Sequence, residues 1–218
     1  MTYRTEDFAA EYDVSRETLD RLIAMDEVLI DWSSRHNLIA RSTMEDRWER
    51  HYRDSAQLYG LIPAGAKTLA DLGSGAGFPG LILAAMGAGR GLKVTLVEAT
   101  GKKCAFLAAS IAAMGLSNVE VVPQRIESIT ISPPDVVTAR ALAQLDKLLG
   151  YSHEFTSEKT VLIFPKGQDV EAELTAAAKS WHMKVEKRPS VTSPGSTILV
   201  IRDLKPKAAV SPVRNRRP

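Results

Sequence analysis

The chain has 218 residues, of which 44% are hydrophobic and 25% charged, the ordinary composition of a soluble globular protein with one core domain and an appendage. Its formal net charge is only +2, and residues 205–218 hold five basic residues and no acid, so the rest of the chain carries −3 once these five charges are subtracted. This distribution excludes a uniformly cationic nucleic-acid binder and confines the basic excess to the end of the chain.

Cysteine usage and hydropathy exclude further classes of protein. Cys104 is the only cysteine, so an intrachain disulfide and a cysteine-rich zinc site are excluded, and the histidines show no metal-ligand spacing. The first ten residues include acids where a signal peptide needs an apolar core, and no apolar run approaches the roughly 20 residues that span a bilayer. We therefore expect a cytoplasmic protein with no metal and no membrane partner. Nothing in the sequence demands more than a monomer.

Residues 1–60 are predicted to form a helical N-terminal extension. Ser15 can cap a helix that runs to about residue 36, because apolar residues recur along it at spacings of three or four. A second helix, dense in charge, is expected over about 43–59. A proline and a glycine then break the chain before the pattern changes.

Residues 61–204 are predicted to form one α/β domain. Short apolar runs alternate with helical stretches, which indicates a mostly parallel, doubly wound sheet with helices on each side. The last two strands have no helix between them, so we expect a C-terminal hairpin that adds an antiparallel strand. The expected strands are 67–72, 93–97, 119–122, 135–139, 160–164, 183–187 and 197–201, and the expected helices are 79–86, 102–114, 142–150 and 169–180. Residues 205–218 are expected to be a basic, disordered tail.

The strongest local signal is the run from Asp71 to Gly80, Asp-Leu-Gly-Ser-Gly-Ala-Gly-Phe-Pro-Gly, which follows the first strand of the α/β region and opens a helix. Glycines in such a loop let the backbone turn tightly and approach a ligand closely. Glu98 ends the second strand, where open α/β sheets bind ligands and where a carboxylate can accept hydrogen bonds from a ribose. Four glycines with an acid on each flanking strand exceed what a structural turn requires, so we expect a nucleoside site.

Two cofactors compete for this loop. Gly75 to Gly80 formally matches the G-x-G-x-x-G dinucleotide fingerprint, and Glu98 lies about 20 residues further on. Three observations argue against NAD. Asp71 at the mouth of the loop would repel a pyrophosphate but attract an ammonium and a sulfonium, Pro79 removes a donor from the helix start, and the glycines run one register longer. We therefore expect S-adenosyl-L-methionine, with an NAD-dependent oxidoreductase as the alternative.

Several short motifs, weak one by one, follow one another in a specific order between about residues 37 and 201. They are Asn37-Leu38, Arg50-His51 with Asp54-Ser55, the Asp71–Gly80 loop, Gly101-Lys102-Lys103 with Phe106-Leu107, Arg125 with Glu127, Arg140-Ala141 and Lys166-Gly167. In this order they resemble the RsmG (GidB) family, whose members methylate N7 of a guanine in 16S ribosomal RNA. The resemblance implies a Rossmann-like class I methyltransferase fold, S-adenosyl-L-methionine as cofactor, and 16S rRNA or the small ribosomal subunit as partner. A methyltransferase of another RNA or of a small molecule, and a non-enzymatic RNA-binding module, remain alternatives.

The candidate site residues come from their positions in the sheet and from the resemblance. Arg140 and Lys166 follow consecutive strands, at the carboxyl ends where ligands collect. N7 of guanine carries a lone pair and no proton, so methyl transfer needs positioning and charge complementarity rather than a general base. The loop and the resemblance together place the cofactor on Asp71, Gly73, Gly75, Gly77, Phe78, Glu98, Ile126, Glu127 and Arg140. The resemblance implies that Arg125, Arg140 and Lys166 hold the RNA phosphate or the guanine.

Four residues of the N-terminal extension, Asn37, Arg50, His51 and Asp54, allow two interpretations. Spacing alone favours a solvated helix face, with Arg50 and Asp54 as an exposed pair four residues apart. The family resemblance instead favours a lid over the mouth of the cofactor site.

Overall fold

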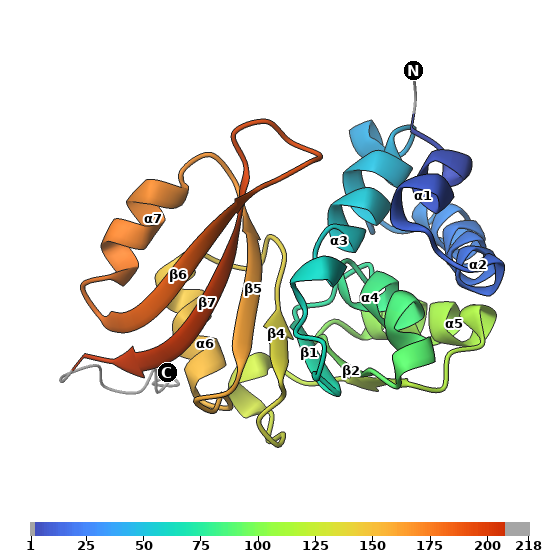
Figure 1. Ribbon diagram of the computed structural model, residues 1–218. Coiled ribbons are helices and arrows are strands. Elements are labelled where there is room, and N and C mark those ends of the chain that lie inside the picture. The colour runs from blue at the N-terminus through green and yellow to red at the C-terminus, as the bar shows by residue number, and fades with distance from the viewer. Residues whose placement is uncertain (1–2, 208–218) are drawn as a thin grey trace.

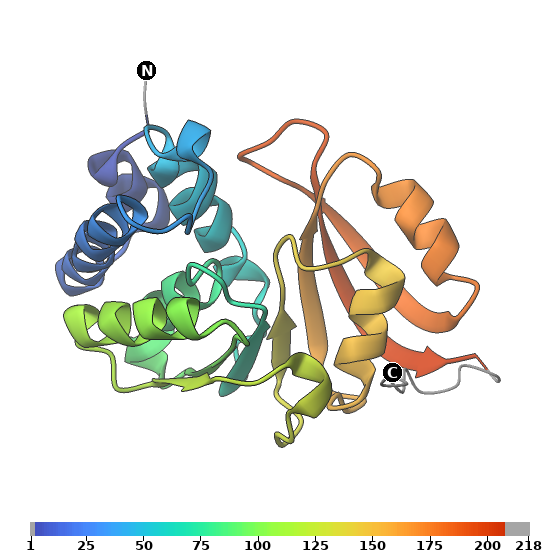
Figure 2. The ribbon, with the colours of Figure 1, turned by 180° about the vertical axis from the view of Figure 1, so that it is seen from behind.

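The computed structural model describes residues 3–207 and consists of a seven-stranded sheet with helices on both faces (Figures 1 and 2). The strand order is β3-β2-β1-β4-β5-β7-β6, in which β1 to β5 are parallel and β7 is antiparallel to both of its neighbours. The strands are β1 (Thr68–Leu72), β2 (Lys93–Val97), β3 (Val119–Val122), β4 (Val136–Thr138), β5 (Val161–Lys166), β6 (Trp181–Pro189) and β7 (Thr197–Pro206). The predicted doubly wound sheet with a C-terminal hairpin is confirmed.

The part of the chain that the structure describes has seven α-helices. They are α1 (Thr5–Tyr12), α2 (Arg16–Ser33), α3 (Asp54–Ala56), α4 (Gly80–Gly87), α5 (Gly101–Met114), α6 (Leu145–His153) and α7 (Val170–Ala177). Shorter helical segments are 3-10 turns at Arg41–Thr43, Tyr59–Leu61, Ala88–Arg90 and Ile126–Ser128, and a π-helical segment at Trp48–Arg53. The sequence did not predict α1, which is short and buries only one of its residues, Phe8.

The sheet separates two hydrophobic clusters. Alternate residues of the strands, such as Leu69 and Leu96, share one cluster with α4 and α5 and with α2, which packs on these two helices. Leu72 and Val97 pack on the other face with α6 and α7. Alternation along a strand sends successive side chains to opposite faces, so both faces of these strands are buried. Because β1 to β5 run in the same direction, their carboxyl ends and the loops that follow them lie at one common edge of the sheet.

The N-terminal extension confirms one predicted helix and corrects the other. The Ser15 side chain accepts a hydrogen bond from the backbone N–H of Thr18, as a cap of α2 should, although α2 ends at Ser33 rather than near residue 36. The second predicted helix is not regular, because residues 48–53 form a wider π-helical turn before α3 begins. Such turns often occur at functional sites.

The last strand runs beyond the boundary at which the sequence predicts a basic tail. Lys205 pairs with His182 across the β6–β7 hairpin, and its ammonium lies 2.9 Å from a carboxylate oxygen of Glu158. Lys205 therefore belongs to the sheet, and the remainder of the predicted tail, residues 208–218, lies outside the described residues. Within residues 3–207, no helix is long and apolar enough to cross a membrane, and no three His, Cys, Asp or Glu side chains are grouped to hold a metal ion.

Candidate functional site

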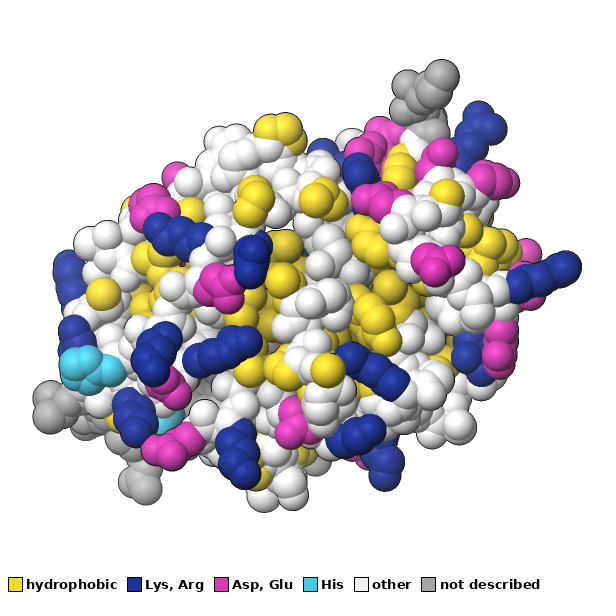
Figure 3. Space-filling model, in the orientation of Figure 1, with side chains coloured by type: hydrophobic (Ala, Val, Ile, Leu, Met, Phe, Trp, Pro, Cys, Tyr) yellow, Lys and Arg dark blue, Asp and Glu magenta, His cyan; other side chains and the backbone are white. Residues whose placement is uncertain are grey.

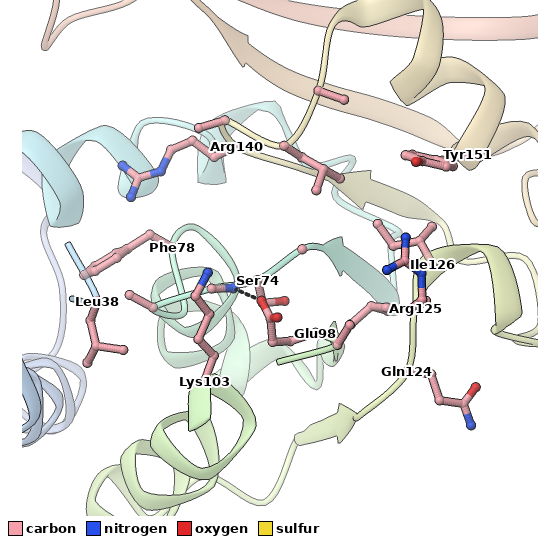
Figure 4. Close-up of a pocket in the computed structure, with 18 of the residues that line it drawn as sticks. Leu38, Ser74, Phe78, Glu98, Lys103, Gln124, Arg125, Ile126, Arg140 and Tyr151 are labelled. Atoms are coloured by element: carbon pink, nitrogen blue, oxygen red, sulfur yellow. Dashed lines mark hydrogen bonds between the residues drawn. The ribbon is translucent and has the colours of Figure 1, made fainter. Parts of the chain in front are cut away.

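A cavity of about 470 Å³ opens at the carboxyl ends of β1, β2 and β4, beside the N-terminal extension (Figure 4). We call it the donor cavity, because the sequence predicts that the methyl donor binds here. Leu38 and Phe78 stand on one side of it, Ile126 and Tyr151 on the other, and Glu98 lies between them. The cavity thus has an apolar side chain at each end and a carboxylate in its middle.

The glycine loop forms the floor of the donor cavity in a backbone conformation that other residues rarely adopt. Gly73, Gly75 and Gly77 have φ angles of +66°, +57° and +81°. A Cβ atom at Gly73 would lie 2.6 Å from the Cδ1 atom of Leu142, and one at Gly77 would lie 2.4 Å from Leu81. Gly73 and Gly75, both predicted to bind the cofactor, line the cavity. Gly77, also predicted to bind the cofactor, does not line it and packs against Leu81 and Leu107 instead.

Glu98 is held in the middle of the donor cavity by two backbone amides. Its Oε2 accepts a hydrogen bond of 3.0 Å from the N–H of Gly75 (Figure 4). Its Oε1 accepts one of 2.8 Å from the N–H of Thr100. The side chain is almost fully buried, so the amides fix its direction. Each carboxylate oxygen keeps a lone pair that can accept from a ligand hydroxyl.

The structure corrects the predicted position of Asp71. This residue is fully buried and does not line the donor cavity, so it does not stand at the mouth of the loop. Its Oδ1 accepts from the hydroxyl of Thr138 at 2.8 Å, and its Oδ2 accepts from the N–H of Gly80 at 3.3 Å. Burial raises the pKa of Asp71 to about 6, although the hydrogen bonds that its carboxylate accepts from Thr138 and Gly80 oppose this rise. Asp71 joins the loop to β4 and to the start of α4 from below.

Replacing Asp71 with alanine should lower the free energy of unfolding by about 2–4 kcal/mol, because a buried hydroxyl and a buried amide both lose their acceptor. Asp71→Asn should be milder, since the remaining amide oxygen can still accept from Gly80. Urea denaturation at pH 7 measures both variants. Equal stability of Asp71→Ala and the parent protein would contradict this role.

Arg140 connects the sheet to the N-terminal extension. Its Nη1 lies 3.2 Å from Oδ2 of Asp54 and donates at 3.3 Å to the backbone carbonyl of Arg50. Its Nη2 lies 3.1 Å from Nδ1 of His51, and its guanidinium carbon is 5.2 Å from the centre of the Phe78 ring. The interpretation from spacing alone, an exposed pair of Arg50 with Asp54, is therefore wrong. The carboxylate pairs with Arg140 from the sheet instead.

His51 has a defined protonation state in this arrangement. Burial, followed by the charges of Arg140 and Arg50, lowers the pKa of His51 to about 3, so the ring is neutral near pH 7. Nδ1 accepts from Arg140, and Nε2 donates at 2.8 Å to the hydroxyl of Thr43, whose own proton goes to the carbonyl of Ala40. The ring also stacks on Phe78, with 5.1 Å between the ring centres. His51 and Phe78 together form one wall of the donor cavity.

Lys166 lies in a second cavity of about 280 Å³, which shares Arg140 and Ala141 with the donor cavity. We call it the acceptor cavity. The ammonium of Lys166 is 2.6 Å from Oε2 of Glu173 and donates at 3.1 Å to the carbonyl of Ala143. The structure therefore brings Lys166 close to Arg140 but places it apart from the predicted cofactor residues, with its charge already paired.

The remaining predicted residues gather at the far end of the donor cavity. Arg125, Ile126 and Glu127 line it, and the Glu127 carboxylate accepts from Arg125 at 3.3 Å and from the hydroxyl of Tyr151 at 3.2 Å. Sequence reasoning did not assign Leu38, Ile39, Lys103, Leu142 or Tyr151 to the site, although all five line the cavity. Only Leu38 and Lys103 carried a signal, because both fall in the motifs quoted above.

Comparison with known proteins assigns the chain to a family. Residues 18–200 match the model of GidB, rRNA small subunit methyltransferase G. The chain belongs to this family. Proteins named ribosomal RNA small subunit methyltransferase G are 46% identical in Rhodospirillum centenum, over 94% of this chain and 94% of that protein, and 46% identical in Paramagnetospirillum magneticum, over 91% and 95%.

Solved structures with little sequence identity share the fold of this GidB family member. The mitomycin 7-O-methyltransferase MmcR superposes with a TM-score of 0.59 at 14% identity, covering 91% of this chain and 71% of that one. The structure of M. jannaschii TYW2 in complex with AdoMet superposes with a TM-score of 0.56 at 15% identity, covering 80% of each chain. The fold is that of S-adenosylmethionine-dependent methyltransferases, and family membership removes the dinucleotide alternative.

Proposed function

We propose that this protein transfers a methyl group from S-adenosyl-L-methionine to N7 of a guanine in 16S ribosomal RNA of the small subunit. The observation that carries the proposal is the match of residues 18–200 to a family of rRNA small subunit methyltransferases. The relatives at 46% identity bear the same description and cover nearly the whole chain. The choice of guanine N7 comes from the family resemblance of the separated motifs.

The residues of the donor cavity fit the cofactor. Glu98 offers carboxylate lone pairs for the ribose hydroxyls, and Ile126 lies beyond it, where an adenine would find an apolar surface. Gly73 and Gly75 leave the floor free of side chains, so that a ligand can approach the backbone. The bound cofactor supplies a methyl group on a positively charged sulfur.

The surroundings of Arg140 suit transfer to a nitrogen that carries no proton. His51 is neutral near pH 7 and both of its ring nitrogens are already hydrogen-bonded, so it holds the wall rather than taking a proton. Arg140 lies at the junction of the two cavities, where it can orient the acceptor beside the methyl donor. The protein's contribution is then positioning and electrostatic complementarity.

Contact with RNA is supported by cations near the cavities. Lys and Arg side chains are spread among Asp and Glu side chains over the face shown in Figure 3, so the support comes from single cations at the cavities rather than from a continuous basic patch. Arg125 at the rim of the donor cavity has 69% of its side chain exposed, and Arg50 at the acceptor cavity is also exposed. Phosphate contacts of this kind make binding depend on salt concentration.

The test is transfer of tritiated methyl groups to small ribosomal subunits from cells that lack this protein, followed by mapping of the modified base. Label at one guanine N7, lost when unlabelled S-adenosylhomocysteine is added, is the expected result. Transfer to free metabolites with none to subunits would favour a small-molecule methyltransferase instead. Label on another RNA or at another base would also overturn the proposal.

A further inference from the structure

The acceptor cavity lies beyond β4 and β5, on the far side of Arg140 from the donor cavity. Its walls come from three separate parts of the chain: Asp54 of the N-terminal extension, Arg140 and Lys166 at the ends of two neighbouring strands, and Glu173 of α7. The loop between β6 and β7 closes it with hydroxyl groups, among them that of Thr192. It adjoins the donor cavity directly, because both are lined by Arg140 and Ala141.

Lys166 and Glu173 place a hydrogen-bond donor and a hydrogen-bond acceptor side by side in this cavity. Their charged atoms are 2.6 Å apart, and only 10% and 21% of their side chains are exposed. Oε2 of Glu173 also accepts from the backbone N–H of Leu145 at 2.6 Å, which fixes the carboxylate. Among residues 3–207, Oε1 of Glu173 has no hydrogen-bond partner, so it is available to a ligand in the cavity.

This pair is complementary to one nucleobase. The Watson–Crick edge of guanine carries adjacent N–H donors at N1 and N2, which a carboxylate accepts, and an acceptor at O6, which an ammonium donates to. Adenine and cytosine would instead turn a ring-nitrogen lone pair toward the carboxylate. Uracil has one ring N–H but lacks the amino group. In a cavity of low exposure these differences are large, because an unpaired buried polar group costs free energy.

We infer that the acceptor cavity takes an unstacked guanine base, with Oε1 of Glu173 accepting from its adjacent N1 and N2 donors and Lys166 donating to O6. This leaves N7, which lies off that edge, free to face Arg140 and the methyl donor. The inference rests on the proposed function and adds to it the residues that select guanine. Glu173 on α7 is then a specificity-determining residue, although no sequence motif singled it out.

The test compares the nucleotides GMP, IMP and AMP as ligands of the full-length protein saturated with S-adenosylhomocysteine, by NMR titration. GMP should bind about ten- to a hundredfold more tightly than AMP, with IMP between them because it lacks N2. In Glu173→Gln the preference for GMP should fall by at least about tenfold. Methyl transfer to unmethylated small subunits should fall in the same variant, while its affinity for S-adenosylhomocysteine stays unchanged.

Glu171→Gln is the matched control, because Glu171 lies on the same helix but pairs with Lys187 on the exposed surface. It should keep both the nucleotide preference and the activity. Equal binding of GMP and AMP to the parent protein, or an undiminished preference in Glu173→Gln, would overturn the inference even if methyl transfer to subunits is normal. Conversely, a protein that prefers GMP but methylates no RNA would refute the proposed function and leave the guanine cavity standing.

Discussion

Gly73→Asp is expected to weaken binding of S-adenosylhomocysteine by about a hundredfold or more while the protein still folds. A Cβ atom at Gly73 would lie 2.6 Å from the Cδ1 atom of Leu142, and both residues line the donor cavity, so the new side chain and a displaced Leu142 would compete with the nucleoside for space. The φ of +66° adds about 1–2 kcal/mol of backbone strain. Calorimetric titration measures the affinity, and thermal melting shows whether the variant remains folded.

Two controls separate the causes of this loss. Gly73→Asn has the same size without the charge, so a similar loss would assign the effect to occupied space. Gly75→Ala introduces comparable backbone strain, but a Cβ atom there meets nothing closer than 3.7 Å and should disturb binding less. Unchanged affinity in Gly73→Asp would remove the nucleoside from the floor of the donor cavity, and the site assignment would fail.

Arg140→Ala is expected to lower methyl transfer by about a hundredfold or more, because the guanidinium stands between the two cavities and orients both walls. The substitution removes one partner of Asp54 and one of His51 together, and it removes the cation that lies over the ring of Phe78. Stability should fall by about 1–3 kcal/mol, since the Asp54 carboxylate is mostly buried. Single-turnover transfer assays and melting curves measure the two effects separately.

Arg140→Lys keeps the charge but cannot reach Asp54, His51 and the Arg50 carbonyl at once, because an ammonium lacks the planar fork. It should therefore recover stability better than activity. If Arg140→Lys and Arg140→Ala both transfer methyl groups at the parent rate, Arg140 only connects the sheet to the N-terminal extension and has no role in the reaction. If activity in the two variants falls only as far as the fraction of folded protein falls, the same conclusion holds.

The architecture could be predicted because its signals are local. The apolar runs at residues 93–97 and 119–122 match β2 and β3 residue for residue, and the glycine loop directly follows the end of β1. The π-helical turn at residues 48–53 could not be predicted, since the same charged sequence satisfies a regular helix. Its geometry depends on packing against Phe8 and Phe78, which come from distant parts of the chain.

The site was only partly accessible to sequence reasoning for a related reason. Position along a strand was enough to place Arg140 and Glu98 at the ligand-binding edge. It could not show that Asp71, on the same edge, is covered by the loop that it holds. Nor could it show that Lys166 is paired with Glu173, because seven residues separate them along the chain and the contact depends on how α7 packs on the sheet.

The loop between β6 and β7 connects the acceptor cavity to the N-terminal extension. Its Thr192 donates to the same Asp54 carboxylate that holds Arg140, and Gln57 beside it accepts from the backbone of Val191. Figures 1 and 2 show this loop reaching from the far side of the sheet toward the N-terminal helices. If a ligand in one cavity moved Arg140, the Asp54 carboxylate that Thr192 also contacts would lose its ion pair, and the hold of the β6–β7 loop on the other cavity would change. Such a coupling would be reciprocal, so each ligand would alter the affinity of the other by the same factor.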